Sequence, residues 1–164
     1  MMKIGVVSDT HSKDVPPQLI KDFQKVDLIV HAGDFCSLED YQFFQKIQEV
    51  KAVYGNVDEQ RLCRKLPRRQ VFEVEGVKIG VYHGEGSPHV VINFVKEEFK
   101  KDKVDVVIFG HSHYPFNEKI GKVLYFNPGS PNDIVRSPYC SYGILEIKSK
   151  NNIVAKIVKV DYCG

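Results

Sequence analysis

Five short strings along this chain carry side chains that bind metal ions. They read Ser-Asp-Thr-His, Gly-Asp, Gly-Asn-Val-Asp, His-Gly and Gly-His-Ser-His, in that order. The candidate metal ligands in these strings are Asp9, His11, Asp34, Asn56, His83, His111 and His113. Imidazole nitrogens mixed with carboxylate and amide oxygens suit Mn²⁺, Fe²⁺, Co²⁺, Ni²⁺ or Zn²⁺ better than Ca²⁺ or Mg²⁺. The absence of cysteine from this set argues against a purely structural zinc site, and the sequence therefore predicts a transition-metal centre.

The ligand types also indicate a pair of ions and a hydrolytic reaction. The carboxylate of Asp34 is able to bridge two ions and hold them about 3.5–4 Å apart, as two-metal hydrolases require. A water shared between such ions loses a proton near neutral pH and becomes a nucleophile, while the ions hold the phosphoryl oxygens. The chain has no Gly-x-Ser-x-Gly string, so a serine nucleophile of that kind is not indicated. We therefore expect metal-dependent cleavage of phosphoesters.

Each string has a simpler explanation when it is taken alone. An aspartate after a strand often caps a loop, and Gly-Asp is a common pair. The Gly-His-Ser-His string is more informative, because two imidazoles so close together on one loop bring little packing advantage. The ordered set, with each string placed after an apolar run, favours one metal centre over five unrelated loops.

These apolar runs read as buried strands. Runs of about 4–8 residues that are rich in β-branched side chains and bounded by Gly, Asp or Asn are typical of such strands. The runs cover residues 3–7, 27–30, 52–54, 77–82 and 104–109. In open α/β sheets, ligands bind at the carboxyl ends of the strands. We therefore expect the seven side chains to converge at one edge of the fold.

The segments between and after these runs predict helices and hairpins. Apolar side chains at three- or four-residue spacing predict helices over residues 16–25, 37–50 and 88–101. Turn residues between alternating runs predict hairpins within residues 71–81, 119–123 and 142–160. Strands alternating with helices form βαβ units, and the hairpins make the sheets mixed. We expect an α/β fold with two packed mixed β-sheets flanked by helices, in a single domain over residues 1–164.

Composition limits the class of protein. The 164 residues are 43% hydrophobic and carry a formal net charge of +2, which fits one globular domain with its own core. No segment approaches the ~20 apolar residues of a membrane span, and we read no signal peptide. We therefore expect a cytoplasmic protein with no membrane partner. The cysteines lack Cys-x-x-Cys spacing and are expected to be reduced thiols; they are Cys36, Cys63, Cys140 and Cys163.

A basic cluster follows the third string, and an additional histidine lies close to the second. The basic residues are Arg61, Arg64, Lys65, Arg68 and Arg69. The simpler interpretation of the cluster is a solvated loop beside the site, and the alternative is a contact with an anionic substrate or partner. His31 lies at the end of a predicted strand, and we expect it to be buried and hydrogen-bonded, where it orients a ligand.

The five strings, in this order, resemble the calcineurin-like metallophosphoesterase superfamily, whose pattern is Asp-x-His, Gly-Asp, Gly-Asn-x-Asp, a later His, and Gly-His-x-His. The resemblance spans residues 3–143. The short length and the Asn-Pro-Gly-Ser string at residues 127–130 make the chain similar to the small single-domain phosphodiesterases of bacteria and archaea. This resemblance implies two mixed sheets packed as a sandwich with helices outside, in agreement with the elements above.

The resemblance also implies a role for each candidate ligand. The first metal ion would be held by Asp9, His11, Asp34 and His113. The second would be held by Asp34, Asn56, His83 and His111. Asn56 would in addition contact the scissile phosphate, as the catalytic residue of the set. The resemblance implies Mn²⁺ as the metal, with Ni²⁺, Zn²⁺, Co²⁺ and Fe²⁺ as alternatives, and small phosphodiesters as substrates.

The chain departs from the family pattern at two positions. Many members have a histidine directly after the metal-binding asparagine, where it is thought to protonate the leaving group, but this chain has Val57. Valine cannot donate a proton, and general acid catalysis contributes about 10²–10⁴ in rate. We therefore expect slow cleavage of DNA and of other esters with poor leaving groups. The second departure is Glu85, where many members read His-Gly-His; it either shapes substrate choice or faces solvent.

Three readings of the function remain at this level. The first is the phosphodiesterase, and the second is a phosphomonoesterase or nucleotide pyrophosphatase that uses the same site. The third is a non-catalytic scaffold, like the retromer subunit that keeps this fold but has lost several ligand histidines; the complete ligand set argues against it. We expect a small phosphodiester as the partner and no nucleic acid, because no long basic tract is present. The resemblance leaves a homodimer open.

Overall fold

The computed structural model describes residues 1–161, which form two five-stranded sheets. The first sheet has the strand order β10-β9-β1-β2-β3, and the second has the order β4-β5-β6-β8-β7. The strands are β1 (Met2–Val7), β2 (Leu28–His31), β3 (Val50–Ala52), β4 (Arg69–Val74), β5 (Val77–Tyr82), β6 (Val106–Ile108), β7 (Phe116–Ile120), β8 (Val123–Asn127), β9 (Ser141–Ser149) and β10 (Asn152–Lys159). Strands β1–β3 are parallel, as are β5, β6 and β8, and antiparallel strands flank both groups. This is the predicted α/β fold with two mixed sheets.

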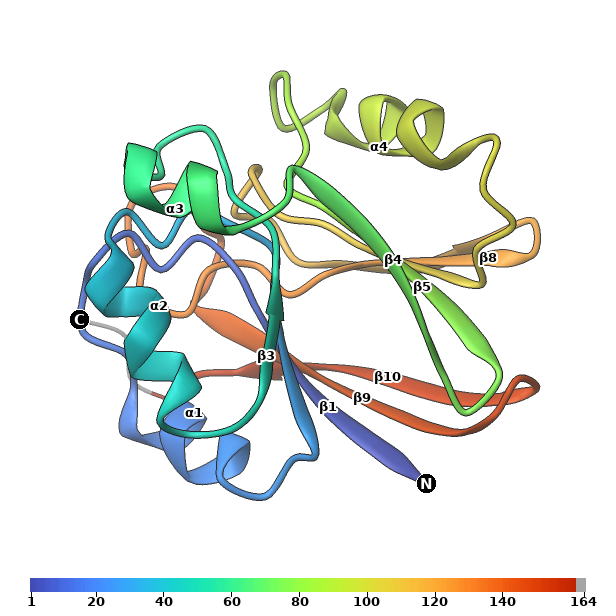
Figure 1. Cartoon of the computed structure of the whole chain (residues 1–164), viewed down its shortest axis with the longest axis horizontal. Coiled ribbons are helices and arrows are strands. Elements are labelled where there is room, and N and C mark those ends of the chain that lie inside the picture. The colour runs from blue at the N-terminus through green and yellow to red at the C-terminus, as the bar shows by residue number, and fades with distance from the viewer. Residues whose placement is uncertain (162–164) are drawn as a thin grey trace.

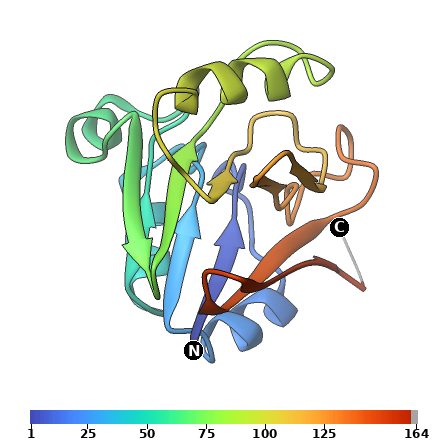
Figure 2. The same ribbon diagram turned by 90° about the vertical axis from the view of Figure 1, so that its right-hand side faces the viewer.

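Helices cover the outer faces of the two sheets. They are α1 (Pro17–Phe23), α2 (Leu38–Gln45), α3 (Gln60–Lys65) and α4 (Val91–Phe99). Figures 1 and 2 both place α1 and α4 at opposite ends of the molecule, with the strands between them. Three hydrophobic clusters correspond to these layers: one lies between the sheets, one joins α1 and α2 to the first sheet, and one joins α4 to the second. The central strands are therefore covered on both faces.

Strand β1 shows how the sequence produces this layering. Its side chains point alternately to the two faces of the sheet. Ile4 and Val6 belong to the cluster between the sheets, whereas Val7 belongs to the cluster under α1 and α2, and all three are fully buried. A strand buried on both faces needs a nearly continuous apolar run, which is what the sequence carries there.

Two strand glycines allow a helix to approach each sheet closely. A Cβ atom at Gly5 in β1 would lie 2.7 Å from the ring of Phe23 in α1. A Cβ atom at Gly80 in β5 would lie 2.6 Å from the ring of Phe99 in α4. Both distances are shorter than carbon atoms tolerate, so glycine is required for each aromatic ring to sit against its strand.

The predicted hairpins are present, but several boundaries differ from expectation; the helix predicted over residues 88–101, for example, spans Val91–Phe99. The helix expected over residues 37–50 begins as predicted, with Ser37 accepting a hydrogen bond from the backbone nitrogen of Asp40, but it ends at Gln45. Val50 instead begins β3, which pairs in parallel with β2, so the strand predicted over 52–54 starts two residues earlier. Pairing with a strand distant in sequence thus overrides the helical pattern, which tertiary context commonly does.

The basic cluster is not a loop. Arg61, Arg64 and Lys65 lie on α3, which the sequence analysis missed, and the other two arginines lie beside or in β4. Arg68 forms an ion pair with Glu98 (Nη1 to Oε1, 2.8 Å), and Arg69 forms one with Asp102 (Nη2 to Oδ2, 2.7 Å). Since Glu98 lies in α4, these pairs join β4 to that helix and its C-terminal end. The prediction of a loop was wrong, although Arg61 and Arg68 are exposed to solvent.

The cysteines match the expectation of reduced thiols only in part. Cys36 and Cys63 are free thiols, as expected. Cys140 is disulfide-bonded, so for this residue the expectation of a reduced thiol was wrong, because sequence spacing does not disclose which segments meet in space. Cys163 lies outside the described residues.

Within residues 1–161, no helix has both the length and the apolar character needed to cross a membrane.

Candidate metal centre

The seven candidate ligands lie in loops that leave the carboxyl ends of five strands. Loops after β1, β2 and β3 of the first sheet carry Asp9 with His11, Asp34, and Asn56, respectively. Loops after β5 and β6 of the second sheet carry His83, and His111 with His113. Because the two sheets pack face to face with these ends together, neither sheet alone contains the whole set.

Two groups of donor atoms share the carboxylate of Asp9. In the first, the donor atoms of Asp9, His11 and His113 all lie within 4.8 Å of one another. Nε2 of His113 is 3.3 Å from Oδ1 of Asp9, and Nε2 of His11 is 3.8 Å from the same oxygen. In the second group, Asp9, Asp34 and His83 meet the same 4.8 Å limit. Each group has the composition of a transition-metal site.

Asp34, a member of the second group, also faces His11 of the first. Its Oδ2 atom is 3.5 Å from Nε2 of His11 and 3.1 Å from Nε2 of His83. Asn56 and His111 extend the second group: Oδ1 of Asn56 is 3.1 Å from Nε2 of His83 and 3.2 Å from Nδ1 of His111. The structure therefore brings all seven side chains into one cluster, with Asp34 at its centre.

Two buried atoms of the cluster lack a hydrogen-bond partner among the described residues. They are Oδ1 of Asp9 and Nε2 of His11. The other carboxylate oxygen of Asp9 accepts hydrogen bonds from the Ser8 hydroxyl (2.7 Å) and from the backbone nitrogen of His111 (3.0 Å). An unpaired buried carboxylate oxygen is costly unless a cation meets it. One oxygen of Asp9 thus holds the loops together, and the other fits a divalent cation.

Several of these residues have left-handed backbone conformations. The φ angles of Asp9, Asp34 and His111 are 59°, 63° and 71°, and His11 and His113 also have positive φ. Such values are uncommon outside glycine, although Asp, Asn and His adopt them more readily than most residues. Strain of this kind concentrates at functional sites, where the surrounding structure maintains it.

Comparison with known proteins identifies the family. A family model described as the calcineurin-like phosphoesterase superfamily domain matches residues 2–150. The chain belongs to this superfamily. The probable metallophosphoesterase MJ0623 of Methanocaldococcus jannaschii is 34% identical, covering 98% of this chain and 82% of the relative. The phosphodiesterase MJ0936 of the same organism is 30% identical, covering 78% of this chain and 83% of that protein.

A solved structure confirms the fold. The crystal structure of Vps29 from Chaetomium thermophilum superposes with a TM-score of 0.79, covering 96% of this chain and 97% of that one. The two sequences are only 20% identical, so this likeness concerns the fold alone. The superfamily assignment rests on the family model and on the two archaeal relatives.

The glycines of the superfamily strings allow loops to approach each other closely. A Cβ atom at Gly55 would lie 2.1 Å from Oδ1 of Asp34, and one at Gly110 would lie 2.0 Å from the Ser8 hydroxyl oxygen. Any side chain at either position would displace the aspartate or serine that it meets. These glycines therefore keep loops from different strands in contact around the cluster.

Polar groups outside the seven hold the candidate ligands in place. Asp58 accepts hydrogen bonds from the backbone nitrogens of Asp34 (2.9 Å), Gly55 (2.7 Å) and Cys36 (2.7 Å). Nδ1 of His83 lies 2.7 Å from the carbonyl oxygen of Ala32 and donates a hydrogen bond to it. In this tautomer Nε2 carries the lone pair, and it faces the cluster. Asp58 stands in the third string, so its position there was the one available signal for its role.

Asp133 also belongs to the candidate site, although no sequence pattern indicated it. Its carboxylate accepts a hydrogen bond from Nδ1 of His113, so that Nε2 of the imidazole points at Asp9. Asp133 lies 20 residues beyond His113, outside the five strings that carry the candidate ligands. Only the fold of the loop after β8 places this carboxylate beside the histidine.

The carboxylates and imidazoles of the metal-free cluster shift each other's pKa values. Burial alone would raise the pKa of Asp9, but His83 and the other nearby imidazoles outweigh burial and hold it well below its usual value. The nearby carboxylates of Asp34 and Asp9 raise the pKa of His11 to about 9. Burial alone would lower the pKa of His83, but the carboxylates of Asp9 and Asp34, together with the carbonyl of Ala32, outweigh burial and raise it to about 9. Metal ions must therefore displace protons from these imidazoles.

His31 lies behind the cluster, as predicted. It is fully buried, with Nε2 3.1 Å from the Thr10 hydroxyl and Nδ1 accepting from the backbone nitrogen of Gly33 (3.1 Å). Its ring stacks on Phe35 with the centroids 3.5 Å apart. Burial lowers the pKa of His31 to about 3, so the imidazole is neutral and connects the loops after β1 and β2.

The two departures from the superfamily pattern have distinct surroundings. Val57 is 44% exposed beside Asn56, and its backbone nitrogen donates to Oδ1 of Asp34 (3.0 Å). Glu85 accepts a hydrogen bond from the Tyr82 hydroxyl (3.2 Å), which also accepts one from Arg68 (3.1 Å). Glu85 therefore joins the polar network around Arg68 and Tyr82, whereas Val57 faces outward beside the cluster.

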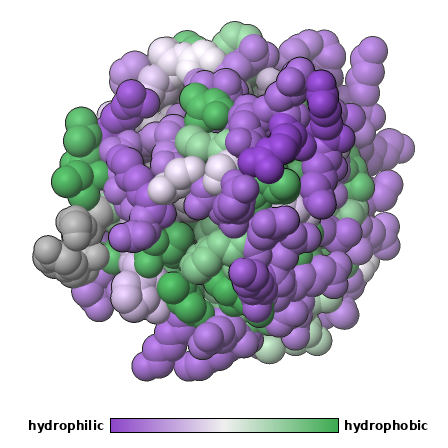
Figure 3. Space-filling model, turned by 60° about the vertical axis from the view of Figure 1, so that its left-hand side comes forward, coloured by the Kyte–Doolittle hydropathy of each residue, from purple (hydrophilic) through white to green (hydrophobic). Residues whose placement is uncertain are grey.

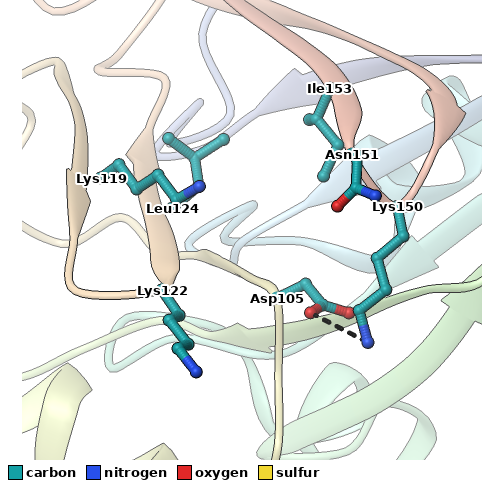
Figure 4. A pocket seen from close by; sticks show the side chains of 7 residues that line it. All are labelled: Asp105, Lys119, Lys122, Leu124, Lys150, Asn151 and Ile153. Carbon is teal, nitrogen blue, oxygen red and sulfur yellow. Dashed lines mark ion pairs between the residues drawn. The ribbon is translucent and has the colours of Figure 1, made fainter.

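Two hollows adjoin the cluster, and a third lies at the other end of the sheets. The first, of about 260 Å³, is lined by Asp9, His11, Lys13, His113 and Arg136 among others. The second, of about 400 Å³, is lined by residues that include His111, His113 and Tyr114. The third contains Lys119, Lys122 and Lys150, and Figure 4 shows Lys150 paired with Asp105 (3.6 Å). Asp105 directly precedes β6, whereas the His111 loop follows it, so this lysine-rich hollow is remote from the cluster.

Proposed function

We propose that this chain is a two-metal phosphodiesterase that hydrolyses small phosphodiesters with Mn²⁺. The observation that carries the proposal is the position of Asp34 between His11 and His83, with the Asp9 oxygen that accepts no hydrogen bond beside both groups. The relative named phosphodiesterase supports the reaction type. The first ion would be held by Asp9, His11, Asp34 and His113, and the second by Asp34, Asn56, His83 and His111.

The protein side chains contribute to the reaction in three ways. Bound divalent ions would supply a water of lowered pKa and neutralise charge on the phosphoryl oxygens. Asp34 and Asp9 fix the positions of both groups, and the amide of Asn56, exposed at the mouth of the cluster, would orient the phosphoryl group by donating from Nδ2. The carbonyl of Ala32 and the carboxylate of Asp133 keep His83 and His113 in the ligating tautomer.

The surroundings of Val57 limit the class of substrate. An alkoxide leaves slowly unless a proton reaches it, and the side chain next to Asn56 cannot supply one. Esters of acidic alcohols and phenols need no such help, because their anions are stable at neutral pH. We therefore propose that good leaving groups are cleaved much faster than aliphatic ones.

The proposal is tested by comparing bis-p-nitrophenyl phosphate with p-nitrophenyl phosphate. The protein is stripped of metal and titrated with Mn²⁺, and an Asp34→Asn variant provides the control. Diester hydrolysis that requires Mn²⁺ and is lost in the variant is the expected result. Faster hydrolysis of the monoester would move the assignment to a phosphomonoesterase. A lack of turnover with every transition metal tested would refute the enzymatic reading.

The scaffold alternative draws on the likeness to Vps29, which concerns the fold alone. Figure 3 shows one face of the molecule, on which groups of hydrophobic residues are exposed among hydrophilic ones. Patches of this kind mark protein contacts in some proteins. The intact cluster favours the enzyme, and a homodimer remains a prediction that sedimentation would test.

A further inference from the structure

The loop after β8 is attached to the loop that carries Asp9 and His11. The hydroxyl of Ser130 donates to the carbonyl oxygen of Asp9 (2.9 Å), and the side-chain amide of Asn132 donates to that of Thr10 (3.0 Å). We call residues 130–136 the anchored loop. The buried side chain of Ser130 fixes the beginning of this loop beside Asp9.

One carboxylate connects the end of the anchored loop to a candidate metal ligand. Asp133 receives its hydrogen bond from His113 at Oδ2, while its Oδ1 accepts from the backbone nitrogens of Val135 (2.9 Å) and Arg136 (3.1 Å). The backbone of Arg136 is therefore held relative to His113 through two bonds to the same side chain.

The guanidinium of Arg136 has no hydrogen bond or ion pair with any residue in the described part of the chain. Arg61, Arg68 and Arg69, in contrast, each pair with a carboxylate. Arg136 lines both hollows that adjoin the cluster. Lys13 lines the first of them, and its ammonium likewise has no ion pair within residues 1–161. Two unpaired cations thus border the space next to His11 and His113.

These two cations exceed what a simple diester requires. If the cluster holds two divalent ions, their charge already balances the combined charge of Asp9, Asp34, one diester phosphate and a hydroxide nucleophile. We propose that Arg136 and Lys13 form a subsite for a second phosphate group of the substrate, adjacent to the phosphoester that is cleaved. The preferred class would then be phosphoesters with a further phosphoryl group, such as nucleoside diphosphate derivatives. A guanidinium suits this role, because it binds phosphate oxygens through two parallel hydrogen bonds.

This inference rests on the proposed function, and a binding measurement tests it separately from turnover. Calorimetry on the Mn²⁺-loaded protein compares adenosine 5′-(α,β-methylene)diphosphate, which resists cleavage between its phosphorus atoms, with adenosine 5′-monophosphate. Arg136→Ala should weaken binding of the diphosphate about 10–100-fold, the value of a lost charge-assisted hydrogen bond or pair of bonds. Binding of the monophosphate should change much less. Arg136→Lys should lie between wild type and Arg136→Ala.

The matched control is Lys122→Ala, which removes one positive charge from the remote hollow. This variant should bind both nucleotides like the wild type. If Arg136→Ala weakened binding of both nucleotides equally, Arg136 would bind the first phosphate. If it weakened binding of neither, Arg136 would not contact the nucleotide. Each result overturns the proposed subsite. Failure of the proposed function would be seen separately, as a lack of Mn²⁺-dependent hydrolysis of bis-p-nitrophenyl phosphate by the wild type.

Discussion

The carboxylate of Asp133 receives a hydrogen bond from Nδ1 of His113, and this pair turns Nε2 of the imidazole towards Asp9. Partners of this kind fix the tautomer of a metal-binding histidine and raise its basicity. The same carboxylate holds the backbone of Arg136. Asp133 thus connects a candidate metal ligand to a candidate substrate-binding residue.

Loss of the Asp133 carboxylate should weaken metal binding. Asp133→Ala removes the acceptor for His113, and we expect Mn²⁺ affinity to fall about 10–100-fold, the usual effect of losing such a partner. Calorimetric titration of the metal-free protein measures it. Asp105→Ala removes a carboxylate from the remote hollow and should leave the affinity unchanged. Equal Mn²⁺ affinity in Asp133→Ala and wild type would contradict the role assigned to this residue.

Binding of Mn²⁺ should tighten as the pH rises. His11 and His83 have pKa values raised to about 9 in the metal-free protein, so at neutral pH an ion must displace their protons. We expect the affinity to increase up to about pH 9 and then to level off. Calorimetry in buffers with different ionisation enthalpies would count the released protons, and binding without proton release would be inconsistent with this account.

The same shifts predict the opposite trend for the stability of the metal-free protein. A raised pKa means that the protonated imidazole is favoured in the folded state. This contribution to the free energy of unfolding is fully present below the ordinary value of 6.5 and is lost as the pH rises through about 9. Urea unfolding of the metal-free protein at pH 6 and at pH 9 measures the difference. In the Mn²⁺-loaded protein the trend should be absent or reversed.

A histidine at position 57 should restore a proton donor. Val57 is exposed beside Asn56, so Val57→His places an imidazole at the mouth of the cluster without filling a buried space. For diesters with aliphatic leaving groups we expect a rate increase of up to about 10²-fold, at the low end of general acid catalysis. Hydrolysis of bis-p-nitrophenyl phosphate should change little. Val57→Gln, which cannot act as an acid, is the matched control, and equal rates in both variants would exclude proton donation from this position.

Addition of one methyl group at Gly5, which packs against Phe23, should lower the stability of the protein. Gly5→Ala places a Cβ atom 2.7 Å from the Phe23 ring, and overpacking of this kind costs about 1–3 kcal/mol. Urea unfolding measures the loss. Because the two side chains are in contact, Phe23→Leu in the Gly5→Ala background should cost less than Phe23→Leu alone. Additive effects would show that the ring is not what limits position 5.

Sequence patterns predicted the strands that carry the candidate ligands, because each is a β-branched run ended by a glycine or a polar residue. They did not predict where α2 ends, since Val50 is drawn into β3 by parallel pairing with β2. Helix α3 was missed for a related reason: its basic side chains read as a loop. Arg68 and Arg69 form ion pairs with Glu98 and Asp102, which lie 30 and 33 residues further along the chain. A local sequence pattern does not reveal contacts over such separations.

The sequence by itself determined the ligand types, their order and their positions at strand ends. These follow from local chemistry and from the alternation of side chains along a strand. Only the tertiary structure decided that Asp34 lies between His11 and His83, that one buried oxygen of Asp9 accepts no hydrogen bond, and that Asp133 and Arg136 adjoin the cluster. These relationships depend on contacts across the chain, such as Ser130 with Asp9 over 121 residues. Packing of the two sheets creates such contacts, and no local pattern encodes them.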